Sequence, residues 1–261
     1  MRKLIDIKIK DAKMIPEIKM VPVKIYDKET GYKAITTVGT NDTISIVTNA
    51  YQPVAHKDVY NEVKKLDKFK INNAMVLKGG RTLMLEITDI KPQEIEIFPG
   101  DSVIRQVRVF NSYDGTRALS VSSFGMRLIC KNGAVAPGLV DRYKKIHTFK
   151  DIQISEISKY VELGMEAWAN SKEVLVRASK TIVVVEDVLG KYKLLSGKYM
   201  EIVKTTVDKT ADKGKDTVYN IWNAYTNVIT HSVSEKTRMS KVVNLQRNVN
   251  KLFNLVPAKT R

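Results

Sequence analysis

The sequence predicts an α+β protein with a strand-rich first half, which begins β-β-β-α, and a helical second half. Two observations predict this class. Short alternating or β-branched segments separated by turn residues fill residues 1–150, and after residue 152 apolar residues recur with the 3.6-residue period of a helix. We therefore expect a basic, strand-rich core domain over 1–150 and a helical region over 151–261 that is packed on it or appended to it.

The strands are predicted from turn residues and alternation. After an N-terminal basic arm that is expected to pair as an edge strand, the expected strands are 21–26, 32–38, 43–48, 74–77, 82–87, 103–110 and two that fold back on each other within 109–133. The first two flank 27–31, where Gly31 is expected to supply the positive φ of a hairpin loop.

The helices are predicted from apolar periodicity. In the first, over 55–69, Val59, Val63 and Leu66 share one face. The later helices are expected at 155–168, 171–189, 196–208, 215–231 and 236–253, with Gly190 and Gly214 as breaks.

Composition limits the class of protein. A chain of 261 residues can bury a sizeable core, and its single cysteine, Cys130, makes no internal disulfide, which favours a reducing compartment. No apolar run approaches the roughly 20 residues of a membrane span, and the charged start lacks the apolar core of a signal peptide. We expect a cytoplasmic protein with no membrane partner, in the host cell cytoplasm if it is phage-encoded.

Charge is the strongest global indication of function. The chain has 44 Lys and Arg against 28 Asp and Glu, a net charge of +16 with a pI of about 9.7. The excess is densest over 102–150, which contains nine Lys and Arg residues and two acidic residues. Such a field favours nucleic acid as the partner, although a lysine-rich surface can also serve solubility.

Residues 109–133 hold the segment around which this positive charge gathers. Asn111, Asp114 and Gly115 are expected to form a structural loop, with Asp114 accepting backbone N–H bonds. Arg105 and Arg108 differ by three positions, so a regular strand points them to opposite faces. Tyr113 and Phe124 could stack on unpaired bases, or pack in the core, which we favour for Phe124.

The predicted nucleic-acid interface combines these cations with the loop tyrosine. Its members are Arg81, Arg105, Arg108, Tyr113, Arg117, Arg127, Lys131, Arg142, Lys144 and Lys145.

A catalytic or metal site is not predicted. His56, His147 and His231 have no partners at metal-ligand spacing, and the basic segment contains two carboxylates, too few for a metal-dependent nuclease. Cys130 could meet a histidine in space, but a cysteine between apolar and basic residues of a strand is more often a packing residue. We expect no enzyme activity, no cofactor and no metal.

Five segments, taken in order, carry a resemblance to a known family. They are SIVTNAYQPVAHKDVYNEV (45–63), NSYDGTRALSV (111–121), RLICKNG (127–133), RYKKIHT (142–148) and VYNIWNAYTNVITH (218–231). This pattern resembles the phage/plasmid-like proteins, a family of unknown function with an Asn-Ser-His/Tyr-Asp-Gly loop, an Arg-x-x-Cys-x-Asn strand and a late Asn-Ala-x-Thr helix ending in His. The matching positions are Asn111, Ser112, Asp114, Gly115, Arg127, Cys130, Asn132, Asn223, Thr226 and His231.

The function expected from these observations is binding. The element order is also similar to that of single-strand annealing recombinases, which is an analogy of fold and weak support for function. We expect non-specific binding of single-stranded DNA, with annealing or protection of that DNA during phage or plasmid replication and recombination, by a homo-oligomer. The alternative is a viral structural or interaction protein that contacts a packaged genome or an acidic partner.

Overall fold

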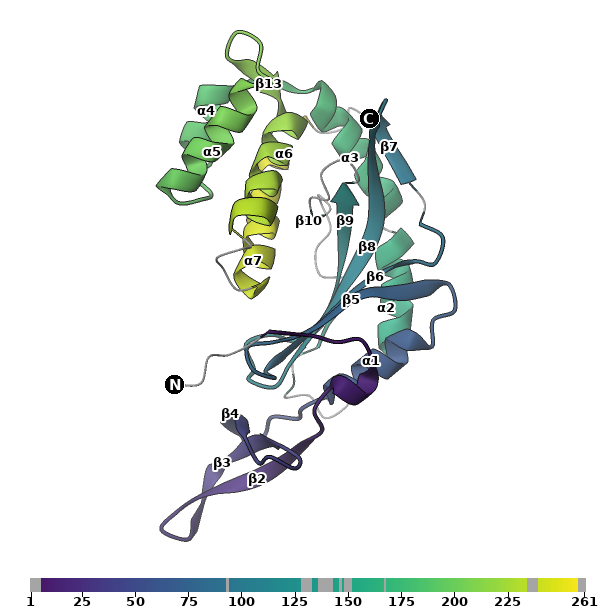
Figure 1. Cartoon of the computed structure of the whole chain (residues 1–261), viewed down its shortest axis with the longest axis vertical. Helices are drawn as coiled ribbons and strands as arrows, with labels where there is room; N and C mark the ends of the chain where they lie inside the picture. Colours follow the sequence, from purple (N-terminus) through teal and green to yellow (C-terminus); the bar gives the residue numbers. More distant parts are fainter. Residues whose placement is uncertain are drawn as a thin grey trace. The chain divides into compact units, whose positions relative to one another are not determined.

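A computed structural model describes residues 6–92, 94–127, 133–135, 143–145, 147, 152–166, 168–233 and 239–257 (Figure 1). It confirms the predicted class, because strands dominate the first half of the chain and helices the second. The strands are β1 (Ile7–Lys8), β2 (Ile18–Ile25), β3 (Lys28–Thr37), β4 (Thr43–Thr48), β5 (Phe69–Leu77), β6 (Thr82–Asp89), β7 (Glu94–Phe98), β8 (Asp101–Ser112), β9 (Leu119–Arg127), β10 (Gly133–Val135), β11 (Tyr143–Lys145), β12 (Ile182–Val184) and β13 (Lys215–Thr217).

The helices follow the same order along the chain. They are η1 (Ala12–Met14), α1 (His56–Lys64), α2 (Glu156–Glu166), α3 (Trp168–Lys180), α4 (Val185–Lys191), α5 (Gly197–Asp208), α6 (Val218–Val228), the π-helical turn η2 (Ile229–Val233), α7 (Met239–Val249) and η4 (Asn250–Leu255). The β-β-β-α order is that of β2, β3, β4 and α1, and β1 pairs with β5 as an edge strand, as expected.

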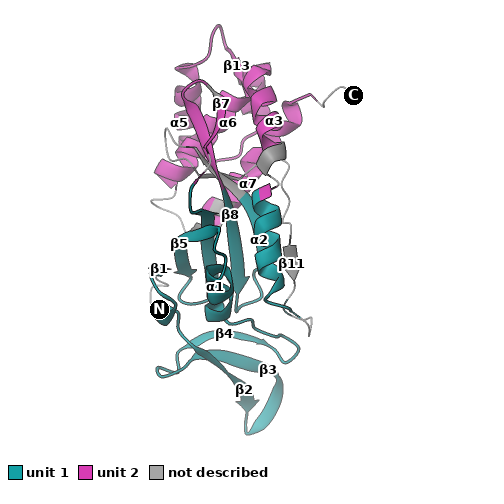
Figure 2. Cartoon of the chain, turned by 90° about the vertical axis from the view of Figure 1, so that its right-hand side faces the viewer, with its two compact units in different colours: residues 1–91, 106–123, 140–165 teal, residues 92–105, 124–139, 166–261 magenta. Residues whose placement is uncertain are grey.

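The chain forms two compact units, each made of three separate segments (Figure 2). Unit 1 contains residues 1–91, 106–123 and 140–165, and unit 2 contains 92–105, 124–139 and 166–261. Strands β8 and β9 therefore contribute residues to both units. This division differs from the expected domains 1–150 and 151–261, which stay a prediction.

In unit 1, an antiparallel sheet is covered by apolar helix faces. Its strand order is β1-β5-β6-β8-β9, and β11 pairs with β9. Val59 and Val63 of α1 and Ile157 and Val161 of α2 are almost fully buried in the core that includes sheet residues such as Leu85. Helical spacing places each pair on one face of its helix.

Helix α2 packs closely on this sheet through a glycine. A Cβ atom at Gly164 would lie 2.9 Å from Cγ2 of Val107 in β8, and the Gly164 carbonyl accepts a hydrogen bond of 2.7 Å from the Ser123 hydroxyl in β9. A larger residue would force the helix and the strand apart.

A second, three-stranded sheet in unit 1 has the order β2-β3-β4. The hairpin between β2 and β3 turns at Tyr26 and Asp27, which have φ values of 48° and 63°, and Ile25 pairs with Lys28. Positive φ at both central residues is the geometry of a two-residue type I′ turn. The prediction of a 27–31 loop was therefore wrong: Gly31 lies within β3, where the register shifts between Pro22 and Lys24 on the opposite strand.

Unit 2 has a helical core around α6. Tyr219, Ile221 and Tyr225 of α6 are fully buried, and the Tyr219 hydroxyl donates to Asp101, which is itself buried in β8, over 2.9 Å. Val203 of α5 joins the same core. The amphipathic faces of these helices are therefore covered by one another.

Among the described residues, five short strands were not predicted. β7 precedes β8, and β10 and β11 pair with β9. β12 interrupts the segment predicted as one helix over 171–189, and β13 occupies the start of the helix predicted over 215–231. The run Ile182-Val183-Val184 is β-branched throughout, and this stiffness at χ1 lowers helix propensity enough for a strand pairing to replace the helix. Gly214, with φ +74°, does break the chain before α6, as predicted. The predicted break at Gly190 was wrong, because Gly190 lies within α4.

Candidate functional site

The loop after β8 is closed by local side-chain hydrogen bonds. Asp114 Oδ1 accepts from the Thr116 backbone N–H over 3.0 Å and from the Thr116 hydroxyl over 2.6 Å. The Ser112 hydroxyl donates to the Arg117 carbonyl and accepts from its N–H. Gly115 has φ +70°, a positive value that glycine adopts without strain. These bonds hold the two strand ends together.

Asn111 precedes this loop and is a residue of β8 rather than of the turn. It is fully buried, and its side-chain amide donates to the Val54 carbonyl over 2.7 Å and lies 2.9 Å from Nδ1 of His56. Because an amide N–H₂ can act as a donor alone, His56 Nδ1 is the acceptor and the ring proton is on Nε2.

Tyr113 joins Asn111 and His56 in what we call the polar cluster, formed by Tyr51, His56, Asn111, Tyr113 and His147. The Tyr113 ring stacks on His56 with centroids 3.7 Å apart, and its hydroxyl accepts the His56 backbone N–H over 2.6 Å. That N–H lies in the first turn of α1, where Ala55 offers no side-chain cap. Tyr113 therefore caps the helix in place of an N-cap side chain.

The rest of the polar cluster is built in the same way. The Tyr51 hydroxyl donates to the Ser112 carbonyl over 2.6 Å, and the Tyr51 ring stacks on His147 with centroids 5.0 Å apart. The Gln52 backbone N–H donates to the His147 carbonyl. These contacts connect the segment before α1, the end of β8 and His147, two residues after β11.

Burial keeps the cluster uncharged. It lowers the pKa of His56 to about 3 and also lowers the pKa of His147, while it raises the pKa of Tyr51 to about 12 and that of Tyr113 further. A histidine that stays neutral across the physiological range contributes shape and hydrogen bonds to unit 1, and no positive charge.

Three of the five segments quoted for the resemblance contribute residues to the polar cluster. Segment 45–63 supplies Tyr51 and His56, segment 111–121 supplies Asn111 and Tyr113, and segment 142–148 supplies His147.

The prediction that Tyr113 stacks on nucleic-acid bases was wrong. Its side chain is 2% exposed and one ring face is covered by His56, so the ring is closed to a nucleic-acid base. The sequence showed a tyrosine beside a turn, but could not show that α1 lies against it.

Three arginines of the predicted interface, Arg81, Arg108 and Arg117, make contacts within the protein. Arg108 is 5% exposed, and its guanidinium binds Glu86 of β6, with Nε and Nη2 2.8 and 2.7 Å from the same carboxylate oxygen. Arg81 Nε donates to the Ile44 carbonyl over 2.8 Å, and the Arg117 guanidinium lies 4.4 Å from the centre of the buried Phe110 ring. In this arrangement Arg108 stabilises a strand pair and is not available to phosphate.

The structure describes the remaining predicted cations in part. Arg105 belongs to unit 2, where it is half-buried and has an interaction within the protein. Lys131 and Arg142 lie outside the described residues, as do Cys130 and Asn132. For Arg127, Lys144 and Lys145 the structure describes the backbone, which lies in β9 and β11.

The late segment of the resemblance forms α6 and the turn that follows. Asn223 and Thr226 are buried there, and the Thr226 hydroxyl donates to the Asn223 carbonyl over 3.0 Å. Among the described residues, neither polar atom of the Asn223 side chain has a hydrogen-bond partner. His231 is exposed and interacts within the protein.

The structure presents aromatic residues that the sequence analysis passed over. Tyr26 is 95% exposed at the tip of the β2–β3 hairpin, and Tyr32 is 52% exposed in β3. Lys24, Lys28 and Lys33 lie beside them in sequence. The signal was present, because this hairpin is a run in which lysines alternate with apolar and aromatic residues, but it was interpreted as a hairpin and nothing more.

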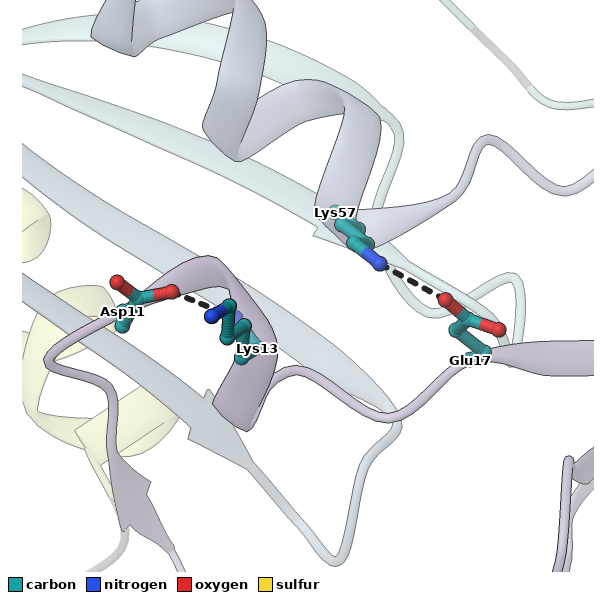
Figure 3. Close-up of polar contacts among 4 residues, drawn as sticks. All are labelled: Asp11, Lys13, Glu17 and Lys57. Carbon is teal, nitrogen blue, oxygen red and sulfur yellow. Dashed lines mark hydrogen bonds and ion pairs between the residues drawn. The ribbon is translucent and has the colours of Figure 1, made fainter.

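The start of this hairpin is fastened to α1. Lys57 of α1 forms an ion pair of 2.8 Å with Glu17, which precedes β2, and Asp11 Oδ1 accepts the Lys13 backbone N–H over 2.9 Å at the start of η1 (Figure 3). The Lys57 hydrogen bond lowers the pKa of Glu17 below its ordinary value. Both groups are partly exposed, so this contact orients the chain more than it stabilises it.

In the described part of the chain, no three His, Cys, Asp or Glu side chains are grouped as metal ligands would be. No helix in the same part of the chain has the length and apolar character that a membrane crossing requires.

Fold and site together define a basic α+β protein in which segments from distant parts of the chain pack around a buried polar cluster. The chain belongs to the family described as Domain of unknown function (DUF932), which matches residues 43–255. The match covers the polar cluster and α6, and begins at the first residue of β4, after the β2–β3 hairpin. Comparisons with curated proteins and with solved structures gave no match.

Proposed function

We propose that this protein binds single-stranded nucleic acid, and DNA in particular, without sequence specificity. The observation that carries the proposal is the net charge of +16. Phosphates are the strongest complement to such an excess, because each neutralised phosphate releases a condensed counterion. The proposal requires binding and no catalysis.

The biological setting follows from the resemblance of the five segments to phage/plasmid-like proteins. In that setting, the protein would anneal or protect single strands during replication or recombination, as a homo-oligomer in the cytoplasm. The β-β-β-α order of β2, β3, β4 and α1 is compatible with the analogy to single-strand annealing recombinases. Annealing follows chemically if a cationic surface reduces the repulsion between two complementary strands.

The test is a titration of labelled oligothymidylate at increasing salt concentration. The logarithm of the binding constant should fall linearly with the logarithm of salt concentration, with a slope of about 0.7 for each phosphate contact. A duplex of equal length serves as the competitor, and solution mass with and without a long oligonucleotide reports oligomer formation. Absence of binding to single-stranded DNA or RNA at low ionic strength would refute the proposal and favour a structural or protein-binding role.

Annealing needs its own measurement. Two complementary oligonucleotides that carry a donor and an acceptor dye should pair faster with the protein than without it. If the strands bind but pair no faster, the protein protects single strands and does not anneal them.

A further inference from the structure

The sheet β2-β3-β4 has one buried face and one open face. Ile35 and Val47 point into a core that contains Tyr51 and Tyr113 of the polar cluster. Strand alternation and the register, in which Val21 faces Ala34 and Ala34 faces Ile46, place the intervening residues on the other side. We call that side the outer face; its residues are Lys19, Val21, Tyr32, Ala34, Ile46 and Thr48.

The outer face and the hairpin tip leave large apolar groups in solvent. Ile46 is 61% exposed, Tyr32 52% and Val21 40%, and Ile25 and Tyr26 at the tip are 59% and 95% exposed. Scattered exposed apolar residues are ordinary, but here they are cross-strand neighbours on one face. Such a face is typical of a surface that a partner covers.

The β2 edge of this sheet argues against strand pairing there with a second copy of the chain. β2 and β4 are the two edge strands, and in β2 the residue Pro22 has no N–H to donate to a new strand. Lys19 and Lys24 stand on the same strand, which contains no acid, and two antiparallel copies would bring these lysines near one another. Proline and lysine on an edge strand are devices that prevent such pairing.

The charge of the hairpin instead complements a polyanion. Residues 18–37 contain four lysines against Asp27 and Glu29. Glu29 faces Lys24 across the hairpin, whereas Lys19 faces Thr36 and Lys28 faces Ile25, so these two lysines have no acid opposite them. A tyrosine ring supplies a stacking surface for any base, which makes the combination suitable for single strands of any sequence.

We propose that a single-stranded nucleic acid binds along the outer face of β2-β3-β4, with bases stacked on Tyr32 and Tyr26 and phosphates beside Lys19 and Lys28. This inference rests on the proposed function and assigns it to a surface outside the basic segment 102–150. Lys19 is opposite Thr36, four residues from Tyr32 along β3, or about 13 Å at the rise of a strand. The lysine and that tyrosine would therefore contact different nucleotides.

The test uses substitutions that keep the backbone conformation. Tyr26→Asn removes a ring at a position with φ 48°, which asparagine tolerates. Tyr32→Thr replaces an aromatic residue by a β-branched one, and both kinds of residue favour a strand. Each should weaken binding of labelled oligothymidylate by about 5-fold or more and leave the salt slope unchanged. Lys19→Gln with Lys28→Gln should weaken binding and also reduce the slope.

Two controls keep the result specific to this surface. Lys64→Gln with Lys68→Gln removes the same charge from exposed positions of unit 1 away from the hairpin, and should affect binding less. Tyr113→Phe removes the hydroxyl that caps α1, and should lower the unfolding midpoint while folded protein binds as before.

The outcomes separate this inference from the proposed function. If the wild-type protein binds and the Tyr26→Asn/Tyr32→Thr variant binds equally well, the surface assignment is wrong and the proposed function stands. If the wild-type protein does not bind, both fail. If it self-associates instead, and the two tyrosine substitutions abolish that association, the outer face is an interface between copies and the nucleic-acid assignment is overturned.

Discussion

His56 is neutral in the folded protein because its side chain is buried against Tyr113 and Asn111. Its folded pKa of about 3 lies below the ordinary value of 6.5, so protonation favours the unfolded chain. The stabilisation is complete above pH 6.5 and is lost as pH falls toward 3. Between pH 7 and pH 5 we expect a loss of about 2 kcal/mol in the free energy of unfolding, measured by urea titration.

The variant His56→Gln provides the comparison for that experiment. It should be less stable than the wild type at pH 7 and should lose less stability between pH 7 and pH 5, with a residual slope from His147, whose pKa is also lowered. Equal slopes in the two proteins would show that His56 does not control the acid sensitivity.

Gly115 allows a second residue-scale prediction. Its φ of +70° is unfavourable for a branched side chain, although a Cβ atom would meet just Tyr51 Cε2 at 3.8 Å, an ordinary contact. Gly115→Val should therefore cost about 1 kcal/mol or more through backbone strain. Gly31→Val is the matched control, since Gly31 lies in a strand with no positive φ and nothing within 4 Å of the added atom. Thermal midpoints measure both, and equal losses would contradict the strain argument.

At the scale of elements, the contact between α2 and the sheet gives the sharpest expectation. Gly164→Ala would normally favour a helix by up to about 1 kcal/mol, but the new methyl group would lie 2.9 Å from Val107. We expect a net destabilisation of about 1–3 kcal/mol from overpacking, measured by urea unfolding. Gly190→Ala in α4 has open space and should be neutral or stabilising. If Gly164→Ala were also stabilising, the close approach would be refuted.

Many elements could be predicted from the sequence because their patterns are local. The apolar spacing of α1 and α2 and the β-branched run of β4 indicate their type without reference to the rest of the chain. The short strands β7, β10, β11, β12 and β13 could not be predicted in this way, since three to five residues carry too little periodicity. The hairpin turn was misplaced because positive φ was assigned to the glycine of the segment, Gly31. In the structure Tyr26 and Asp27 adopt it.

The candidate site was harder to predict than the elements. Local turn chemistry around Asp114 is readable from sequence, but the burial of Tyr113 depends on a helix that begins 57 residues earlier in the chain. The partner of Arg108, Glu86, likewise becomes apparent from the register between β6 and β8. Charge density along the sequence therefore selected arginines that make contacts within the protein. The exposed tyrosines of the hairpin lie in a run of alternating lysines and apolar residues, a pattern that is also typical of an ordinary surface strand.

For the whole molecule, the two interleaved units predict how fragments behave. A fragment of residues 151–261 contains α6 but lacks Ile97, Val103 and Asp101, the hydrogen-bond acceptor of Tyr219. We expect it to show no cooperative thermal transition by circular dichroism, because its core would lose these partners. Residues 92–261, which restore them, are the matched comparison and should show greater helix content. A cooperative transition in 151–261 would support a domain boundary near residue 150.

The interleaving of the units also determines the order in which the protein can fold while it is being synthesised. Domains generally fold as units when their last segment leaves the ribosome, and bacterial or eukaryotic translation adds about 5–20 residues per second. Unit 1 needs residues 140–165 and unit 2 needs the C-terminal helices, so neither is complete when β8 and β9 emerge. We therefore expect β5 and β6 to pair locally in the nascent chain for several seconds, while the apolar side of their hairpin stays exposed to chaperones.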